Sequence, residues 1–114
     1  MPSMPSEAIE AAARLLVETR RANDLLAALP ADLTPPTLAD AYAVQDRVRA
    51  LWGERVVAWK AGATALPVQQ KFGLGEPFAG PAFAPDTVAS PARLPAARFA
   101  HLALESEFAF RIGR

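Results

Sequence analysis

Proline places the strictest limit on regular structure in this chain. Eleven of the 114 residues are proline, and eight of them cluster at 30–36 and 77–95. The total is roughly twice the usual share for a protein. A proline fixes φ and has no amide donor, so it interrupts the interiors of helices and sheets. We therefore expect long irregular connections in these two stretches.

Composition narrows the class of protein. The chain is long enough for one small domain, and its hydrophobic share of 52% favours a packed core over general disorder. A net charge of zero without a basic patch argues against a nucleic-acid partner. No apolar run approaches the ~20 residues that span a membrane, and no secretion signal is recognisable. The absence of cysteine excludes disulfides and thiolate ligands. We expect a soluble cytoplasmic protein without a membrane partner.

The first half of the chain predicts helices. Apolar residues at helical spacing follow Ser6, which we interpret as a cap, and continue to about Arg21. Residues 23–29 are expected to add a short helix before the first proline cluster. A further helix should begin after Thr37, a good N-cap with an aspartate three residues later, and end at Gly53.

The second half predicts β structure. Residues 55–59 are rich in β-branched and aromatic side chains, which favours a strand. Pro67 to Phe72 predicts a short helix, and residues 75–97 predict loop with short extended pieces. His101 to Ile112 is the clearest strand, because apolar and polar residues alternate there. The expected fold is α+β, with a helical region at 1–53 and a β-rich domain at 54–114. That domain should be incomplete, since its last strand reaches the chain end without a turn.

Glu105-Ser106-Glu107 is the strongest indication of chemistry. In a strand, residues two apart share a face, which would set these carboxylates roughly 6–7 Å apart at Cα. Repulsion between them requires compensation, and a divalent cation is an efficient source of it. Carboxylate oxygens suit a hard ion such as Mg²⁺ or Mn²⁺. The alternative interpretation is a solvated polar face on a half-exposed strand.

Three other residues are candidates for a site. Lys60 ends an apolar run, so it could hold a substrate carboxylate or transfer a proton, or it could simply reach solvent. Gly62 could allow a ligand to approach the backbone closely. His101 lies roughly 13 Å along the strand from Glu105, too far to share one metal with both glutamates. We expect it to be a surface histidine.

Four segments in the same order resemble motifs of one family. They are AYAVQ at 41–45, VVAWKAGAT at 56–64, VQQ with EPFAGP at 68–81, and LESEFAF at 104–110, the last ending in Gly113-Arg114. Together they resemble the 2-keto-4-pentenoate hydratase group of the fumarylacetoacetate hydrolase superfamily, from about Ala39 onward. One departure is Ala58, where that family commonly has glycine. The resemblance implies a fumarylacetoacetase-like mixed β-roll, of which this chain holds the start.

The same resemblance implies a metal-dependent hydro-lyase in aromatic hydrocarbon catabolism. Such enzymes add water to 2-hydroxypenta-2,4-dienoate and give 4-hydroxy-2-oxopentanoate. Glu105 and Glu107 would bind Mg²⁺ or Mn²⁺, while Lys60 and Gly62 would contact the 2-oxo acid, with Lys60 also catalytic. The full protein would form a homo-oligomer.

The family's third acidic metal ligand would fall after the last residue of this chain. We therefore expect the 114 residues alone to be inactive and unstable. Two enzymatic alternatives are a 2-oxo-hexenedioate decarboxylase and an acylpyruvate hydrolase of the same superfamily. A third alternative is a non-catalytic docking or oligomerisation fragment built on the N-terminal helices.

Overall fold

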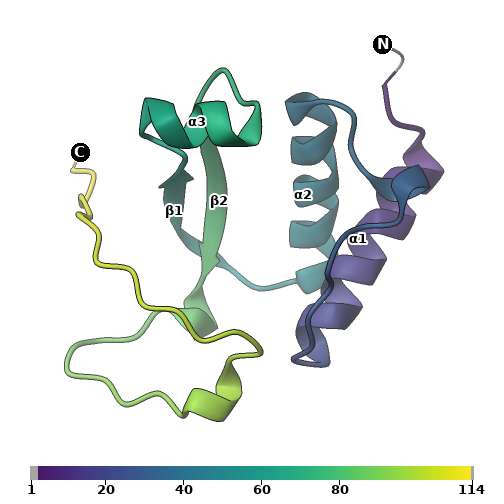
Figure 1. Ribbon diagram of the computed structural model, residues 1–114. Coiled ribbons are helices and arrows are strands. Elements are labelled where there is room, and N and C mark those ends of the chain that lie inside the picture. The colour runs from purple at the N-terminus through teal and green to yellow at the C-terminus, as the bar shows by residue number, and fades with distance from the viewer. Residues whose placement is uncertain (1–2, 114) are drawn as a thin grey trace.

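The computed structural model describes residues 3–113 and shows an α+β arrangement. Figure 1 shows the sheet lying between the helix pair α1 and α2 and the C-terminal segment of the chain. The predicted fold class is confirmed at this level. The helices and strands are α1 (Ser6–Arg21), α2 (Leu38–Trp52), β1 (Val56–Gly62), α3 (Leu66–Phe72) and β2 (Phe78–Phe83), with short 3₁₀ turns at Ala31–Leu33, Ala84–Asp86 and Ala96–Arg98.

Helix α1 confirms the first predicted helix but not its predicted cap. Pro5 occupies the N-cap position, and its carbonyl accepts a hydrogen bond from the Ile9 amide at 3.0 Å. Ser6 is therefore the first helical residue. A proline is tolerated at this end because the first amides of a helix have no partner within the helix. Arg20 and Arg21 lie in the last turn, where positive charge suits the exposed carbonyls.

The short helix predicted for residues 23–29 is wrong. Asn23 adopts a left-handed conformation, with φ of 53°, and its side-chain amide donates to the Ala97 carbonyl at 2.9 Å. The Asp24 carboxylate accepts a hydrogen bond from the Leu25 amide at 2.8 Å. Asn and Asp compete with helical hydrogen bonding through such contacts. The chain therefore leaves the helix here and turns.

Helix α2 confirms both predicted ends. The Thr37 hydroxyl accepts a hydrogen bond from the Asp40 amide at 3.1 Å, as an N-cap does. Gly53 has φ of 77°, and its amide donates to the Arg49 carbonyl at 3.1 Å. The apolar faces of α1 and α2 pack on each other. The buried cluster between them consists of Met4, Ala12, Ala13 and Val44.

Strands β1 and β2 form an antiparallel pair, and α3 connects them. In the register of this pair, Trp59 lies opposite Pro81, Lys60 opposite Gly80, and Gly62 opposite Phe78. Helix α3 confirms the predicted short helix, and β1 continues three residues beyond its predicted end. Strand β2 lies within the stretch for which only short extended pieces were expected. Its proline is tolerated because β2 is an edge strand.

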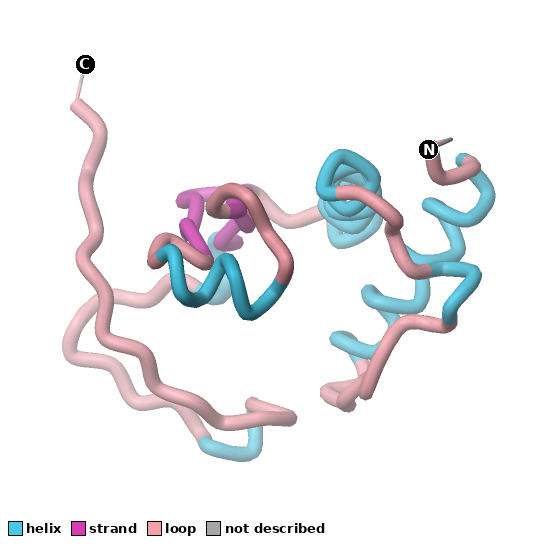
Figure 2. Tube along the Cα trace, turned by 45° about the horizontal axis from the view of Figure 1, so that its top comes forward, coloured by secondary structure: helices cyan, strands magenta, loops and turns pink. Residues whose placement is uncertain are grey.

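The strand predicted for His101 to Ile112 is wrong. Figure 2 shows this whole segment as loop, and within residues 3–113 its backbone makes no ladder with another strand. Four of its apolar side chains are 86% to 97% exposed, namely Leu104, Phe108, Phe110 and Ile112. The alternation of apolar and polar residues would give a strand one apolar and one polar face. A strand also needs a neighbouring strand whose amides and carbonyls pair with its own.

Candidate functional site

Lys60 lies on the sheet face opposite to that of its neighbour Trp59. Its neighbour Trp59 points toward α2, where the Arg49 guanidinium lies 5.1 Å from the centroid of the Trp59 ring. Successive side chains of a strand point to opposite faces. Lys60 and Gly62 therefore share the other face, and Lys60 contacts Glu105 and Glu107 of the C-terminal segment.

The carboxylates of Glu105 and Glu107 meet at the Lys60 ammonium. Oε2 of Glu105 lies 2.6 Å and Oε1 of Glu107 lies 2.8 Å from Nζ of Lys60. All three side chains remain open to water, with exposed fractions of 50% for Lys60, 68% for Glu105 and 46% for Glu107. The residues that sequence reasoning selected separately thus form one cluster. Both glutamates reach the same atom although their segment is not a strand.

Hydrogen bonding within the cluster shifts two pKa values. The hydrogen bond from Lys60 lowers the pKa of Glu105, and the attraction between the two charges adds to this. The bonds to Glu105 and then to Glu107 raise the pKa of Lys60 above its ordinary range. Lys60 is therefore protonated and Glu105 ionised at neutral pH. The positive charge of the Lys60 ammonium therefore lies between the side-chain oxygens of Glu105 and Glu107.

This arrangement fits a cation. Two carboxylate oxygens that converge on one positive atom form the kind of donor set that hard divalent ions accept. Among residues 3–113, no three acidic or histidine side chains gather around a common point. Of about six positions around Mg²⁺ or Mn²⁺, these two glutamates could fill two. The remaining positions would be open to water, to a chelating substrate or to further ligands.

Gly62 has a clear steric role. A Cβ on Gly62 would lie 2.6 Å from two carbons of the Phe78 ring, which covers the glycine from the opposite strand. The sequence allowed a close approach of a ligand at Gly62, and in the structure the Phe78 ring of the chain itself lies there. Phe78 is 41% exposed and borders the Lys60 face. Sequence reasoning missed it, because only the register of the two strands brings these residues together.

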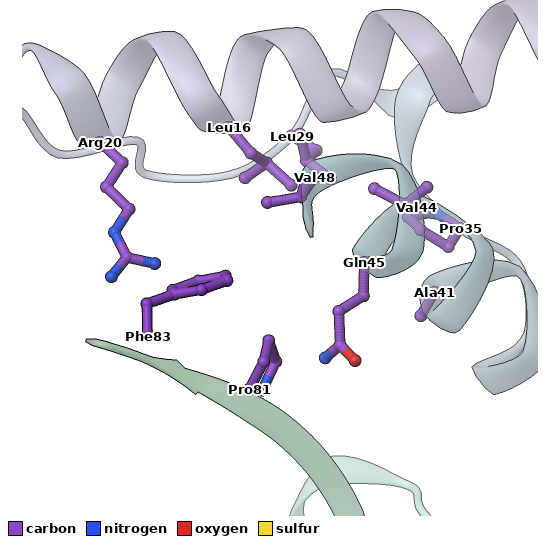
Figure 3. A pocket seen from close by; sticks show the side chains of 10 residues that line it. All are labelled: Leu16, Arg20, Leu29, Pro35, Ala41, Val44, Gln45, Val48, Pro81 and Phe83. Carbon is purple, nitrogen blue, oxygen red and sulfur yellow. The ribbon is translucent and has the colours of Figure 1, made fainter. Parts of the chain in front are cut away.

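A hollow lies between the helix pair and β2, and Figure 3 shows the side chains that line it. Its volume is about 380 Å³, within the usual range for a small-molecule pocket. Its lining is largely apolar, and its polar side chains are already paired. Arg20 bonds to Asp86 at 3.0 Å, and the Gln45 amide donates to the Ala79 carbonyl at 3.0 Å. The Lys60 cluster is therefore the stronger candidate for chemistry.

The His101 side chain is exposed, as expected, and it does not join an acidic cluster in the described part of the chain. Across residues 3–113, every helix is too short or too polar to cross a membrane.

Comparisons with known proteins identify no relative. No family model matches the chain, and no curated protein or solved structure matches it either.

Proposed function

We propose that this chain carries metal- and substrate-binding residues of a hydratase that acts on 2-hydroxypenta-2,4-dienoate or a similar 2-oxo acid. The single observation that supports this most is the convergence of Glu105 and Glu107 on one cation, the Lys60 ammonium, at 2.6 and 2.8 Å. The sequence motifs that contain these residues resemble those of the 2-keto-4-pentenoate hydratases. The proposed fold is the start of their fumarylacetoacetase-like β-roll, and the proposed assembly is a homo-oligomer.

The chemistry would divide between a metal and the chain. A bound Mg²⁺ or Mn²⁺ would act as a Lewis acid toward the carboxylate and 2-oxygen of the substrate. Glu105 and Glu107 would hold the ion. Lys60 would position the anionic substrate or carry a proton.

Thermal unfolding with and without Mn²⁺ tests the metal site. A ligand that binds only the folded state stabilises it by about 2.7 kcal/mol at one hundred times its Kd. We expect Mn²⁺ to raise the unfolding midpoint of the natural sequence. The increase should be lost in Glu105→Gln and Glu107→Gln, and it should be retained in the control Glu76→Gln, which removes an exposed glutamate elsewhere.

Calorimetry with 2-oxopentanoate tests the substrate class. This probe carries the carboxylate and 2-oxygen that a metal chelates but cannot be hydrated as a diene. We expect binding in the presence of Mn²⁺ and none after its removal by a chelator.

In the thermal-unfolding experiment, an Mn²⁺ response that is the same in Glu105→Gln, Glu107→Gln and Glu76→Gln would refute the proposed site.

A further inference from the structure

The Lys60 ammonium occupies the position between the two glutamates that a metal ion would need. The polar side-chain contacts between residues 101–113 and the sheet are those of Glu105 and Glu107 with Nζ of Lys60. The ammonium donates to carboxylate oxygens at 2.6 and 2.8 Å. A divalent ion bound by the same oxygens would lie beside this positive charge. Like charges at such a separation repel each other.

We propose that Lys60 is an internal counter-ion that competes with the divalent metal for Glu105 and Glu107 and leaves them when the metal binds. This inference rests on the metal site of the proposed function. It adds a coupling between the metal and the lysine: one positive group replaces another at the same pair of carboxylates.

The geometry makes this exchange easy. Lysine carries its charge on a flexible four-carbon stem, and the Lys60 side chain is half exposed, so the ammonium can move into water without entering an apolar region. Exposed ion pairs are weak, so a divalent ion can displace this one. Without the lysine, the two carboxylates would repel each other in the metal-free chain.

The exchange has a consequence for substrate binding. Once released, the Lys60 ammonium is free to meet another anion on the same face of the sheet. A 2-oxo acid supplies such an anion through its carboxylate. The metal would therefore have two effects on substrate binding. It would bind the substrate directly, and it would release Lys60 to contact the substrate carboxylate. Metal is then expected to bind before the acid.

Mn²⁺ binding to the full chain, measured by the loss of the electron paramagnetic resonance signal of free Mn²⁺, tests the competition. Lys60→Met and Lys60→Gln remove the competing charge and should bind Mn²⁺ roughly 2- to 30-fold more tightly than the natural sequence, since the two lost ion pairs are exposed and individually weak. Lys71→Met is the matched control, because it removes one lysine charge from α3. It should leave the affinity unchanged. Circular dichroism verifies that each variant is folded.

A second measurement follows Lys60 itself. In the natural sequence, diamagnetic Mg²⁺ should move the Lys60 ε-methylene NMR signal to that of a lysine in water, with the same midpoint as Mg²⁺ binding. A Lys60 signal that stays in place while Mg²⁺ binds would overturn the competition.

The possible outcomes separate this inference from the proposed function. If both Lys60 variants bind Mn²⁺ no more tightly than Lys71→Met, the competition is overturned, although the metal site stands. If no variant binds Mn²⁺, the metal site fails and the competition fails with it. Tighter binding by both Lys60 variants, abolished when Glu105→Gln is added, supports both.

Discussion

At the scale of single residues, Asp40 shows how one side chain joins distant parts of the chain. It is 6% exposed, and its carboxylate accepts the Thr37 hydroxyl and the Met4 amide, the latter at 2.8 Å. The hydrogen bond from Thr37, followed by that from Met4, lowers the pKa of Asp40. The carboxylate thereby completes the N-terminus of α2 and holds the residues before α1 against it.

Asp40 should make stability depend on acid pH. A carboxylate whose pKa is lower in the folded state stabilises the fold above its unfolded pKa, near 3.8, and this contribution disappears as pH falls through the folded value. We expect Asp40→Asn to lower the thermal midpoint at pH 7 and to differ little from the natural sequence at pH 2. Scanning calorimetry at both pH values measures this. An equal deficit at both would show that the charge of Asp40 is not responsible.

The residues of the candidate site were predictable by type but not by contact. The spacing of Glu105 and Glu107 predicted that they act together, and both do reach one point. Their partner was not predictable, because Lys60 is 45 positions earlier than Glu105. Only the path of the C-terminal segment beside the sheet brings these charges together.

At the scale of elements, local signals predicted three helices well. Helices α1, α2 and α3 carry their determinants within the segment, namely apolar periodicity, the Thr37 cap, and the glycines at positions 53 and 73. The two wrong elements depend on distant partners. Residues 23–29 are diverted by a contact between Asn23 and Ala97. Residues 101–112 lack a neighbouring strand within the described structure.

Gly53 gives a test of how α2 ends. An L-residue in the left-handed region costs roughly 1–2 kcal/mol relative to glycine, and Gly53 has φ of 77° with open space where a Cβ would be. We expect Gly53→Ala to lower the free energy of unfolding by about 1 kcal/mol. Urea unfolding measures the loss.

Gly75→Ala is the matched control for this change. A Cβ at Gly75 also meets open space, but Gly75 is not among the positive-φ glycines, so this substitution should leave stability unchanged. Equal losses for the two glycines would contradict a conformational origin.

At the scale of the whole molecule, the helix pair α1 and α2 packs only loosely against the two-stranded sheet. The radius of gyration is 15.6 Å, compared with about 13 Å for a compact domain of this length. Phe83 is the only aromatic residue in the described part that is buried, at 2% exposure. It lies near Trp52 of α2, with ring centroids 6.2 Å apart, and below the Arg20 guanidinium of α1. One side chain therefore connects both long helices to the sheet.

Phe83→Ala should consequently destabilise the whole molecule. Removing a buried phenylalanine costs about 3–5 kcal/mol, a large part of the stability of a small domain. The matched control is Phe110→Ala, because Phe110 is 86% exposed and its loss should change little. Urea unfolding followed by tryptophan fluorescence compares them. Similar stabilities for the two variants would show that Phe83 does not join the layers.

The central claim is that Glu105 and Glu107 form one cation site with the Lys60 face of the sheet. Paramagnetic broadening of backbone NMR signals by substoichiometric Mn²⁺ tests it most directly, because the effect reports where the ion is bound. We predict broadening centred on residues near 58–62, 78–82 and 104–108, because β2 lies opposite Lys60 in the sheet, and its loss in Glu105→Gln. Broadening that is spread over other acidic residues, such as Glu7 and Asp32, or that persists in Glu105→Gln, would contradict the claim.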